Sequence, residues 1–347
     1  ATLSVVDLLV DDDLTVAGDV AVTGDYSSTT SGTSNLRLGV NAGNSIASGG
    51  NYNVVVGDEA GTAITTGDNN TAIGNAALDA TTTSSDNSGI GYNALGSNTT
   101  GASNTGVGSL ALFSNTTADN NTAVGKSALQ VNTTGAQNVA VGGLALDGNT
   151  TASSGTAVGY NALGTNTTGA QNVAVGEGAL ADNTTGATNT AVGQGAMGNN
   201  TTASDNTAVG RKALFTNTTG GANVALGETA LYANTTGSNN VSVGRLSLTA
   251  NTTANNNTAV GNACLDANTT GAGNSSLGAS SLGANTTGAN NVAVGNDALG
   301  ANTTASNNTA VGASSLGANT TGTENVAVGT SALAAVTTGS YNHAFGK

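Results

Sequence analysis

The feature that most constrains this chain is a glycine that recurs every 17 residues over most of its length. No insertion interrupts the series, which comprises Gly57, Gly74, Gly91, Gly108, Gly125, Gly142, Gly159, Gly176, Gly193, Gly210, Gly227, Gly244, Gly261, Gly278, Gly295, Gly312, Gly329 and Gly346. A short period kept over most of a chain is typical of a solenoid, in which each coil contacts only its neighbours. We therefore expect a rod rather than globular domains.

Composition supports this expectation and limits the partners. The 347 residues include 52 Gly and no Pro, and only 7% of them are charged. Such a composition could indicate disorder, but a disordered tract has no reason to keep a strict register. The net charge is −14, whereas nucleic acids and anionic membranes bind basic surfaces, so neither is an expected partner. No apolar run approaches the roughly 20 residues of a membrane-spanning helix.

We number each coil so that the recurring glycine is position 5. The consensus is then N-(T/V)-A-V-G-x-x-A-L-x-x-N-T-T-(G/A)-x-x. Position 4 is apolar throughout and position 9 is Leu, with Met197 as a substitution and Gly61 as an exception, so these two columns are predicted to form the core. Positions 3 and 8 hold small residues, including the single cysteine, Cys264, which we predict to be a buried thiol. Small columns indicate close approach of backbone or of a neighbouring chain.

Local propensities predict the path of each coil. Positions 2–4 favour a strand, and a second short strand is expected at positions 7–9. The glycine at position 5 is expected to make a sharp turn with positive φ. Helices are not expected, because the segments are short and Thr, Asn and Gly are poor helix formers. The predicted fold class is all-β: a parallel β-solenoid with 17-residue coils.

Four polar columns predict ladders along the rod. Asn occupies position 12 from Asn98 to Asn319 and also position 1, where Gly155 is a gap. Asparagines stacked at about 4.8 Å can hydrogen-bond amide to amide and satisfy the turn backbone. Thr fills positions 13 and 14 in every coil. Each Asn-Thr-Thr is also a formal glycosylation sequon, but a turn ladder is the preferred interpretation.

The chain divides into three predicted regions. Residues 1–25 are interpreted as a β-rich connector built on six-residue repeats, residues 26–38 as a linker, and residues 39–347 as the solenoid. The core of one coil supplies only a few kcal/mol, whereas ordering 17 residues costs about 1.5 kcal/mol each. We therefore expect a parallel homotrimer, packed through the small columns at positions 3 and 8.

The repeat core N-V-A-V-G-x-x-A-L, as in 138–146, 172–180 and 291–299, resembles the head repeats of trimeric autotransporter adhesins. That resemblance implies a left-handed parallel β-roll trimer. The N-T-A-V-G, A-L and N-T-T-G elements are also similar to arrays in bacteriophage tail-fibre and related virion fibre proteins, and 13–25 is similar to the connectors of such fibres. The extra N-T-T corner, and the lack of a visible neck or coiled-coil stalk motif, favour the virion fibre.

The sequence offers little for catalysis. His343 is the single histidine, which removes most general-base and metal schemes, so no enzyme activity, cofactor or metal is predicted. Asp11, Asp12 and Asp13 could gather calcium on a threefold axis, but solvated charge is the preferred interpretation.

Position 6 varies freely and should face solvent. Its aromatic residues, together with those at position 10, are the candidate surface contacts for a glycan or receptor: Tyr92 and Tyr160 at position 6, and Phe113, Phe215 and Tyr232 at position 10.

The leading functional hypothesis is a structural shaft of a trimeric fibre, a phage tail fibre or similar virion appendage serving host attachment. The expected location is the virion surface or the extracellular space, and the expected partners are copies of the chain and other fibre or virion proteins. A bacterial trimeric surface adhesin or extracellular filament is the alternative. An ice-binding solenoid is a minor alternative, since the Thr columns repeat at the strand spacing, but we expect only one of them to be exposed.

Overall fold

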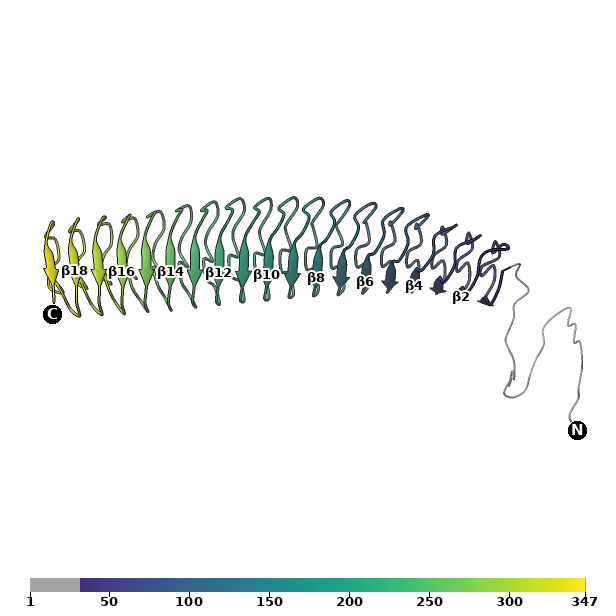
Figure 1. Cartoon of the computed structure of the whole chain (residues 1–347), viewed down its shortest axis with the longest axis horizontal. Coiled ribbons are helices and arrows are strands. Elements are labelled where there is room, and N and C mark those ends of the chain that lie inside the picture. The colour runs from purple at the N-terminus through teal and green to yellow at the C-terminus, as the bar shows by residue number, and fades with distance from the viewer. Residues whose placement is uncertain (1–31, 347) are drawn as a thin grey trace, which may run out of the picture.

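A computed structural model describes residues 32–346, which form a gently curved rod (Figure 1). The predicted connector at 1–25 and the first part of the linker lie outside the described residues. The rod contains 19 strands of three residues, one in each coil, and the described residues include no helix. The strands are β1 Leu36–Leu38, β2 Val54–Val56, β3 Thr71–Ile73, β4 Ser88–Ile90, β5 Thr105–Val107, β6 Thr122–Val124, β7 Val139–Val141, β8 Thr156–Val158, β9 Val173–Val175, β10 Thr190–Val192, β11 Thr207–Val209, β12 Val224–Leu226, β13 Val241–Val243, β14 Thr258–Val260, β15 Ser275–Leu277, β16 Val292–Val294, β17 Thr309–Val311, β18 Val326–Val328 and β19 His343–Phe345.

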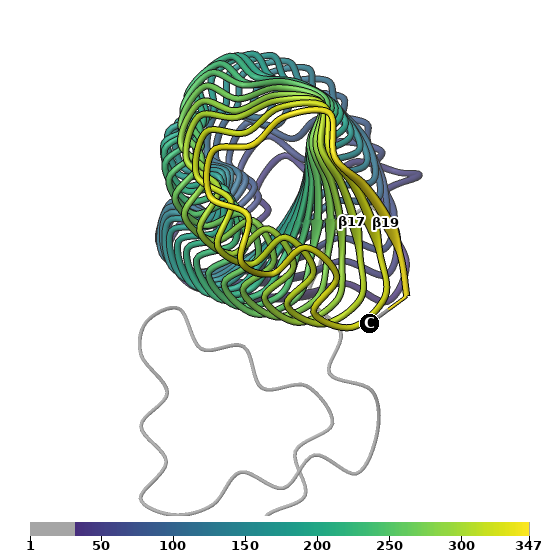
Figure 2. The ribbon, with the colours of Figure 1, turned by 90° about the vertical axis from the view of Figure 1, so that its left-hand side faces the viewer.

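Every strand pairs in parallel with the next strand along the chain. In β8 and β9, for example, Ala157 lies opposite Ala174 and Val158 lies opposite Val175. Viewed along the rod, the strands form one side as a fanned wall and the rest of each coil curves back to close it (Figure 2). The chain is an all-β parallel solenoid with 17-residue coils, which confirms the predicted fold class.

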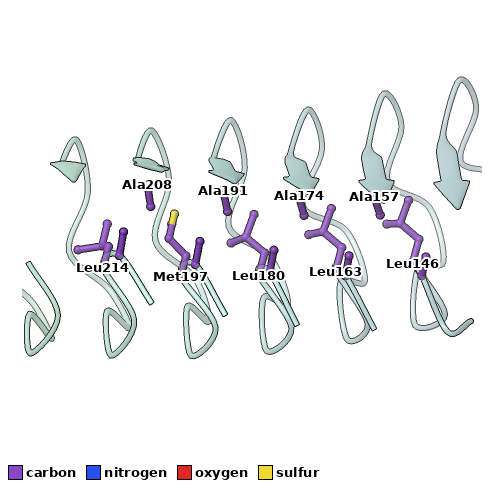
Figure 3. Packing of buried hydrophobic residues seen from close by; sticks show 14 of the residues in the cluster. Leu146, Ala157, Leu163, Ala174, Leu180, Ala191, Met197, Ala208 and Leu214 are labelled. Atoms are coloured by element: carbon purple, nitrogen blue, oxygen red, sulfur yellow. The ribbon is translucent and has the colours of Figure 1, made fainter. Parts of the chain in front are cut away.

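The interior of each regular coil is filled by one large side chain and two small ones. In the coil of Gly159 these are Leu163 from position 9 and Ala157 and Ala162 from positions 3 and 8, all fully buried. Figure 3 shows the position 9 side chains pointing toward the strand alanines in successive coils. The prediction that position 9 forms the core is confirmed.

The prediction that position 4 also forms the core is wrong. Val158 is 37% exposed, and the other residues of its column are likewise half-buried or exposed. Successive side chains of a strand point to opposite faces, so burying Ala157 turns Thr156 and Val158 outward. One leucine from the opposite wall leaves room for only an alanine from the strand.

The small columns are likewise not the contact between chains that we predicted. Positions 3 and 8 lie inside a single coil, where Ala157 and Ala162 have no exposed surface. Cys264, at position 8, is a buried thiol as predicted, with its Sγ 3.4 Å from the carbonyl oxygen of Ser276. The residues at positions 3 and 8 must be small because the leucine side chain of position 9 lies between them.

The expected second strand at positions 7–9 is absent from the described coils, and a series of turns replaces it. Asn161 and Leu163 adopt left-handed backbone conformations, with φ of 54° and 53°. Alternating left-handed residues curl the chain too tightly for a strand. Hydrogen bonds between coils continue nonetheless, as from Leu163 N–H to the oxygen of Ala179 at 3.0 Å.

The glycine at position 5 is required by both its conformation and its surroundings. Gly159 has φ of 135°, and a Cβ atom there would lie 2.6 Å from the oxygen of Gly176 in the next coil. Both observations confirm the predicted role of this column, since no other residue tolerates either condition.

The two Asn columns form the predicted ladders. Asn166 Nδ2 donates to Asn149 Oδ1 at 3.1 Å, and the same contact recurs along position 12. At position 1, Asn121 N–H donates to Asn104 Oδ1 at 2.9 Å. The two columns meet within a coil where they share an acceptor, as Asn121 and Asn132 both donate to the carbonyl oxygen of Gly135, at 3.0 and 2.9 Å. These amides hold the curved part of the coil to the strand.

Candidate functional site

One regular surface of the rod is the outward side of the sheet, formed by positions 2 and 4 of strands β2 to β18. We call this surface the strand face. It holds only Val, Thr, Ser, Ile and Leu, without one charged side chain, although the chain carries a net charge of −14. Val141 and Val158 are 37% exposed and Leu277 is 51% exposed, whereas other valines of the face are half-buried. At about 4.8 Å per strand the strand face extends for roughly 80 Å.

The two tyrosines predicted as surface contacts are exposed. Tyr92 and Tyr160, at position 6, are 55% and 59% exposed. The Tyr160 ring lies over Gly143, whose added Cβ would be 3.6 Å from Cδ2 of that ring. The tyrosines are four coils apart, so they do not form one site.

The three aromatic residues at position 10 are half-buried rather than fully exposed. Phe113 lies alone over Gly96, whereas Phe215 and Tyr232 stack with ring centroids 5.5 Å apart and planes inclined by 11°. Lys212 Nζ lies 5.3 Å from the centroid of Phe215. The structure therefore brings together two of the five predicted contact residues and adds a cation to them.

A charged ladder lies in the same coils, at position 6. Arg211 and Arg245 each pair with Glu228, and the Arg245 Nε to Glu228 Oε2 distance is 3.4 Å. The hydrogen bond and charge of Arg211, followed by those of Arg245, lower the pKa of Glu228. All three residues occupy position 6, which was predicted to face solvent, but their pairing was not predicted. Their mutual spacing of 17 residues was the signal that could have indicated this pairing.

The Asn-Thr-Thr corners are structural in the folded rod. Asn166 is 1% exposed and its Nδ2 donates to two oxygens, so the sequon nitrogen faces the interior. Thr167 Oγ1 donates to the Thr184 oxygen at 2.9 Å, and Thr168 is exposed. As predicted, only one of the two Thr columns faces solvent.

Residues 32–346 show no cluster of three or more His, Cys, Asp or Glu side chains that could hold a metal ion. Nor does that part of the chain contain a helix of sufficient length and hydropathy to cross a membrane. No protein-family model matches the chain, and no curated protein is significantly similar to it.

Proposed function

We propose that this rod is the structural shaft of a homotrimeric fibre, a bacteriophage tail fibre or similar virion appendage that serves host attachment. The observation that carries the proposal is the strand face, an uncharged and largely apolar stripe that follows the whole rod. A contiguous apolar surface of this kind marks an interaction site. Its regular repeat is matched best by a second rod of the same period.

The thin interior of one protomer supports association. A coil buries one leucine and two alanines, as in Leu163, Ala157 and Ala162, which is less apolar surface than a core that also contained position 4. Packing copies in parallel through the strand face would bury the second apolar column, represented by Val158. The gain would grow with the number of coils, as a shaft requires.

Three copies are proposed because the resemblance to adhesin head repeats and virion fibres implies a trimer. Such a fibre would lie on the virion surface or outside the cell and would join other fibre proteins at its ends. A bacterial trimeric adhesin or extracellular filament would use the same rod with a different anchor. Adjacent virion genes would distinguish the fibre from the adhesin.

The mass of the particle tests the proposal. A trimer of the 32.8 kDa chain should have a mass of about 98 kDa by light scattering or native mass spectrometry. Replacing Val141, Val158 and Val175 by Asp should dissociate it, because buried unpaired charges are costly. The same replacement by Asp of Thr151, Thr168 and Thr185 should leave the trimer intact. These three residues lie in the same coils, at the exposed position 14.

Two outcomes would count against the trimeric shaft. The first is a monomeric native chain at micromolar concentration. The second is a trimer that survives the three Asp substitutions on the strand face, which would place the contact elsewhere. In the monomeric case the exposed Thr column at position 14 would remain as a regular polar surface, and thermal hysteresis would test the ice-binding alternative.

A further inference from the structure

Three of the six Lys and Arg residues of the chain lie in the coils of Gly210 and Gly244. They belong to a group in three successive coils that we call the basic aromatic patch: Arg211, Lys212, Phe215, Glu228, Tyr232 and Arg245. The corresponding positions elsewhere on the rod hold mostly small or uncharged side chains. The repeat keeps its register without such residues, so coil stacking does not account for them.

Contacts between coils hold the patch in a fixed arrangement. The ring of Phe215 lies over Gly198, where a Cβ atom would be 2.8 Å from Cε2, and its other neighbour is the stacked ring of Tyr232. The next residue of that column is Thr249, so the ring stack ends at Tyr232. The two stacked rings form a short apolar ridge, and Lys212, whose Nζ lies 5.3 Å from the Phe215 centroid, is the neighbour in the chain of Arg211 in the charged ladder.

The patch has more positive than negative charge. Arg211, Lys212 and Arg245 carry three positive charges against the single negative charge of Glu228, which leaves a formal charge of +2. Among the described residues no carboxylate pairs with Lys212. The side chains of Arg211 and Arg245 remain 55% and 61% exposed, so guanidinium donors are available to a ligand.

We infer that the basic aromatic patch binds a carboxylate-bearing saccharide. Such a ligand combines an apolar face of C–H groups, which suits the Phe215–Tyr232 ridge, with an acidic group that suits Lys212 and the arginines. All of these side chains come from one protomer. The inference therefore goes beyond the shaft function and does not depend on the oligomeric state.

The surroundings favour a short acidic glycan over a long polyanion. Glu177 occupies the position 6 column two coils before Arg211, and Asp266 occupies the position 10 column two coils after Tyr232. These acids confine the positive field to the coils between them. With a net charge of −14, the rest of the rod would repel a polyanion that extended beyond the patch.

Calorimetric titration of the intact chain with 3′-sialyllactose, and with lactose as the neutral probe, tests the inference. The expected dissociation constant for the acidic sugar is about 1 mM, with lactose at least tenfold weaker. Raising the salt concentration should weaken binding, because the contact is partly ionic and exposed. Equal binding of the two sugars, or no binding of either, would overturn the inference.

Substitutions locate the binding. Lys212→Ala, Arg245→Ala and Phe215→Leu should each weaken 3′-sialyllactose binding at least fivefold, whereas Lys126→Ala, a position 6 cation five coils before Arg211, should not change it. Glu228→Gln should strengthen binding about twofold to threefold by releasing the guanidinium groups, a gain that a purely structural ladder would not give. An effect of Lys126→Ala equal to that of Lys212→Ala would refute the assigned location.

Discussion

Ile64 fills the space that Gly61 leaves in the interior of its coil. A Cβ atom on Gly61 would lie 2.8 Å from Ile64 Cδ1 and 2.7 Å from Val55 Cγ1. Regular coils place Leu at the position of Gly61, Asn at the position of Ile64 and Ala at the position of Val55. The coil before it repeats the exchange, with Gly43 facing Ile46. The large interior side chain can therefore come from either side of the turn, but not from both.

This exchange predicts a compensated set of substitutions. Gly61→Leu alone should lower the free energy of unfolding by about 3 kcal/mol, because the new side chain overlaps Ile64 and Val55. Combining it with Val55→Ala and Ile64→Thr reproduces the interior set of the next coil, Ala72, Leu78 and Thr81, and should recover all but about 1 kcal/mol. Chemical denaturation, together with hydrogen exchange of the first coils, would measure the stability of the single variant and of the triple variant.

Ile64→Thr alone serves as the control for this set. It should cost about 2 kcal/mol, because it opens a cavity beside Gly61. If the triple variant were less stable than Gly61→Leu, the interior side chains of this coil would not be interchangeable as proposed.

The sequence was sufficient for the features that depend on periodicity. The parallel register, the Asn ladders and the turn at position 5 all follow from identical residues recurring at one spacing, because stacking brings each residue onto its own copy. Alternation along the strand also accounts for Ala157 lying on the face opposite Thr156 and Val158. The exception at Gly61 was visible, although its compensation by Ile64 was not.

Alternation could not say which side of the strand faces inward. That choice depends on how much volume Leu163 leaves inside the coil, a tertiary quantity that no local pattern contains. The left-handed backbone of Leu163 was also unpredictable, since such a conformation is unfavourable for a leucine by about 1–2 kcal/mol and persists because the side chain is fully buried. The stacking of Phe215 on Tyr232 follows from their shared position 10, whereas the approach of Lys212 to the Phe215 ring depends on turn geometry within one coil.

The gap in the position 1 ladder predicts a stabilising substitution. Asn138 Oδ1 accepts a hydrogen bond from Gly155 N–H at 2.8 Å, but Gly155 has no side chain to continue the ladder to Asn172. Gly155→Asn should raise the free energy of unfolding by about 1–2 kcal/mol, from restored hydrogen bonds and a less flexible unfolded chain. Gly155→Ala should show only the effect of the less flexible unfolded chain. Denaturation midpoints that did not differ between the two variants would contradict the ladder contribution.

The assignment of inside and outside predicts contrasting effects in one coil. Leu163→Asp should cost more than about 4 kcal/mol and unfold its neighbours, because it removes the interior side chain and buries an unpaired charge. Tyr160→Ala should change stability by less than about 0.5 kcal/mol, since its ring is largely in solvent. Thermal melting of both variants decides the matter. A large effect of Tyr160→Ala with none of Leu163→Asp would invert the assignment.

Asp147 predicts a pH-dependent penalty in the middle of the rod. Partial burial raises the pKa of Asp147, so the folded state binds its proton more tightly than the unfolded state does. Asp147 therefore imposes no penalty on the stability of the fold below its unfolded pKa, about 3.9 for aspartate. Stability is lost as the pH rises through the folded pKa, because the buried carboxyl group then becomes charged. Asp147→Asn should raise the Tm slightly at pH 7, by about 1 °C, and should leave it unchanged at pH 3.

Asp266, whose pKa is raised by the same cause, should respond in the same way, and the two effects should add because the sites lie seven coils apart. The exposed Asp182 is the matched control, and Asp182→Asn should not produce this pH-dependent gain. A gain for Asp147→Asn that persisted at pH 3 would show that the amide stabilises the coil through contacts rather than through the removed charge.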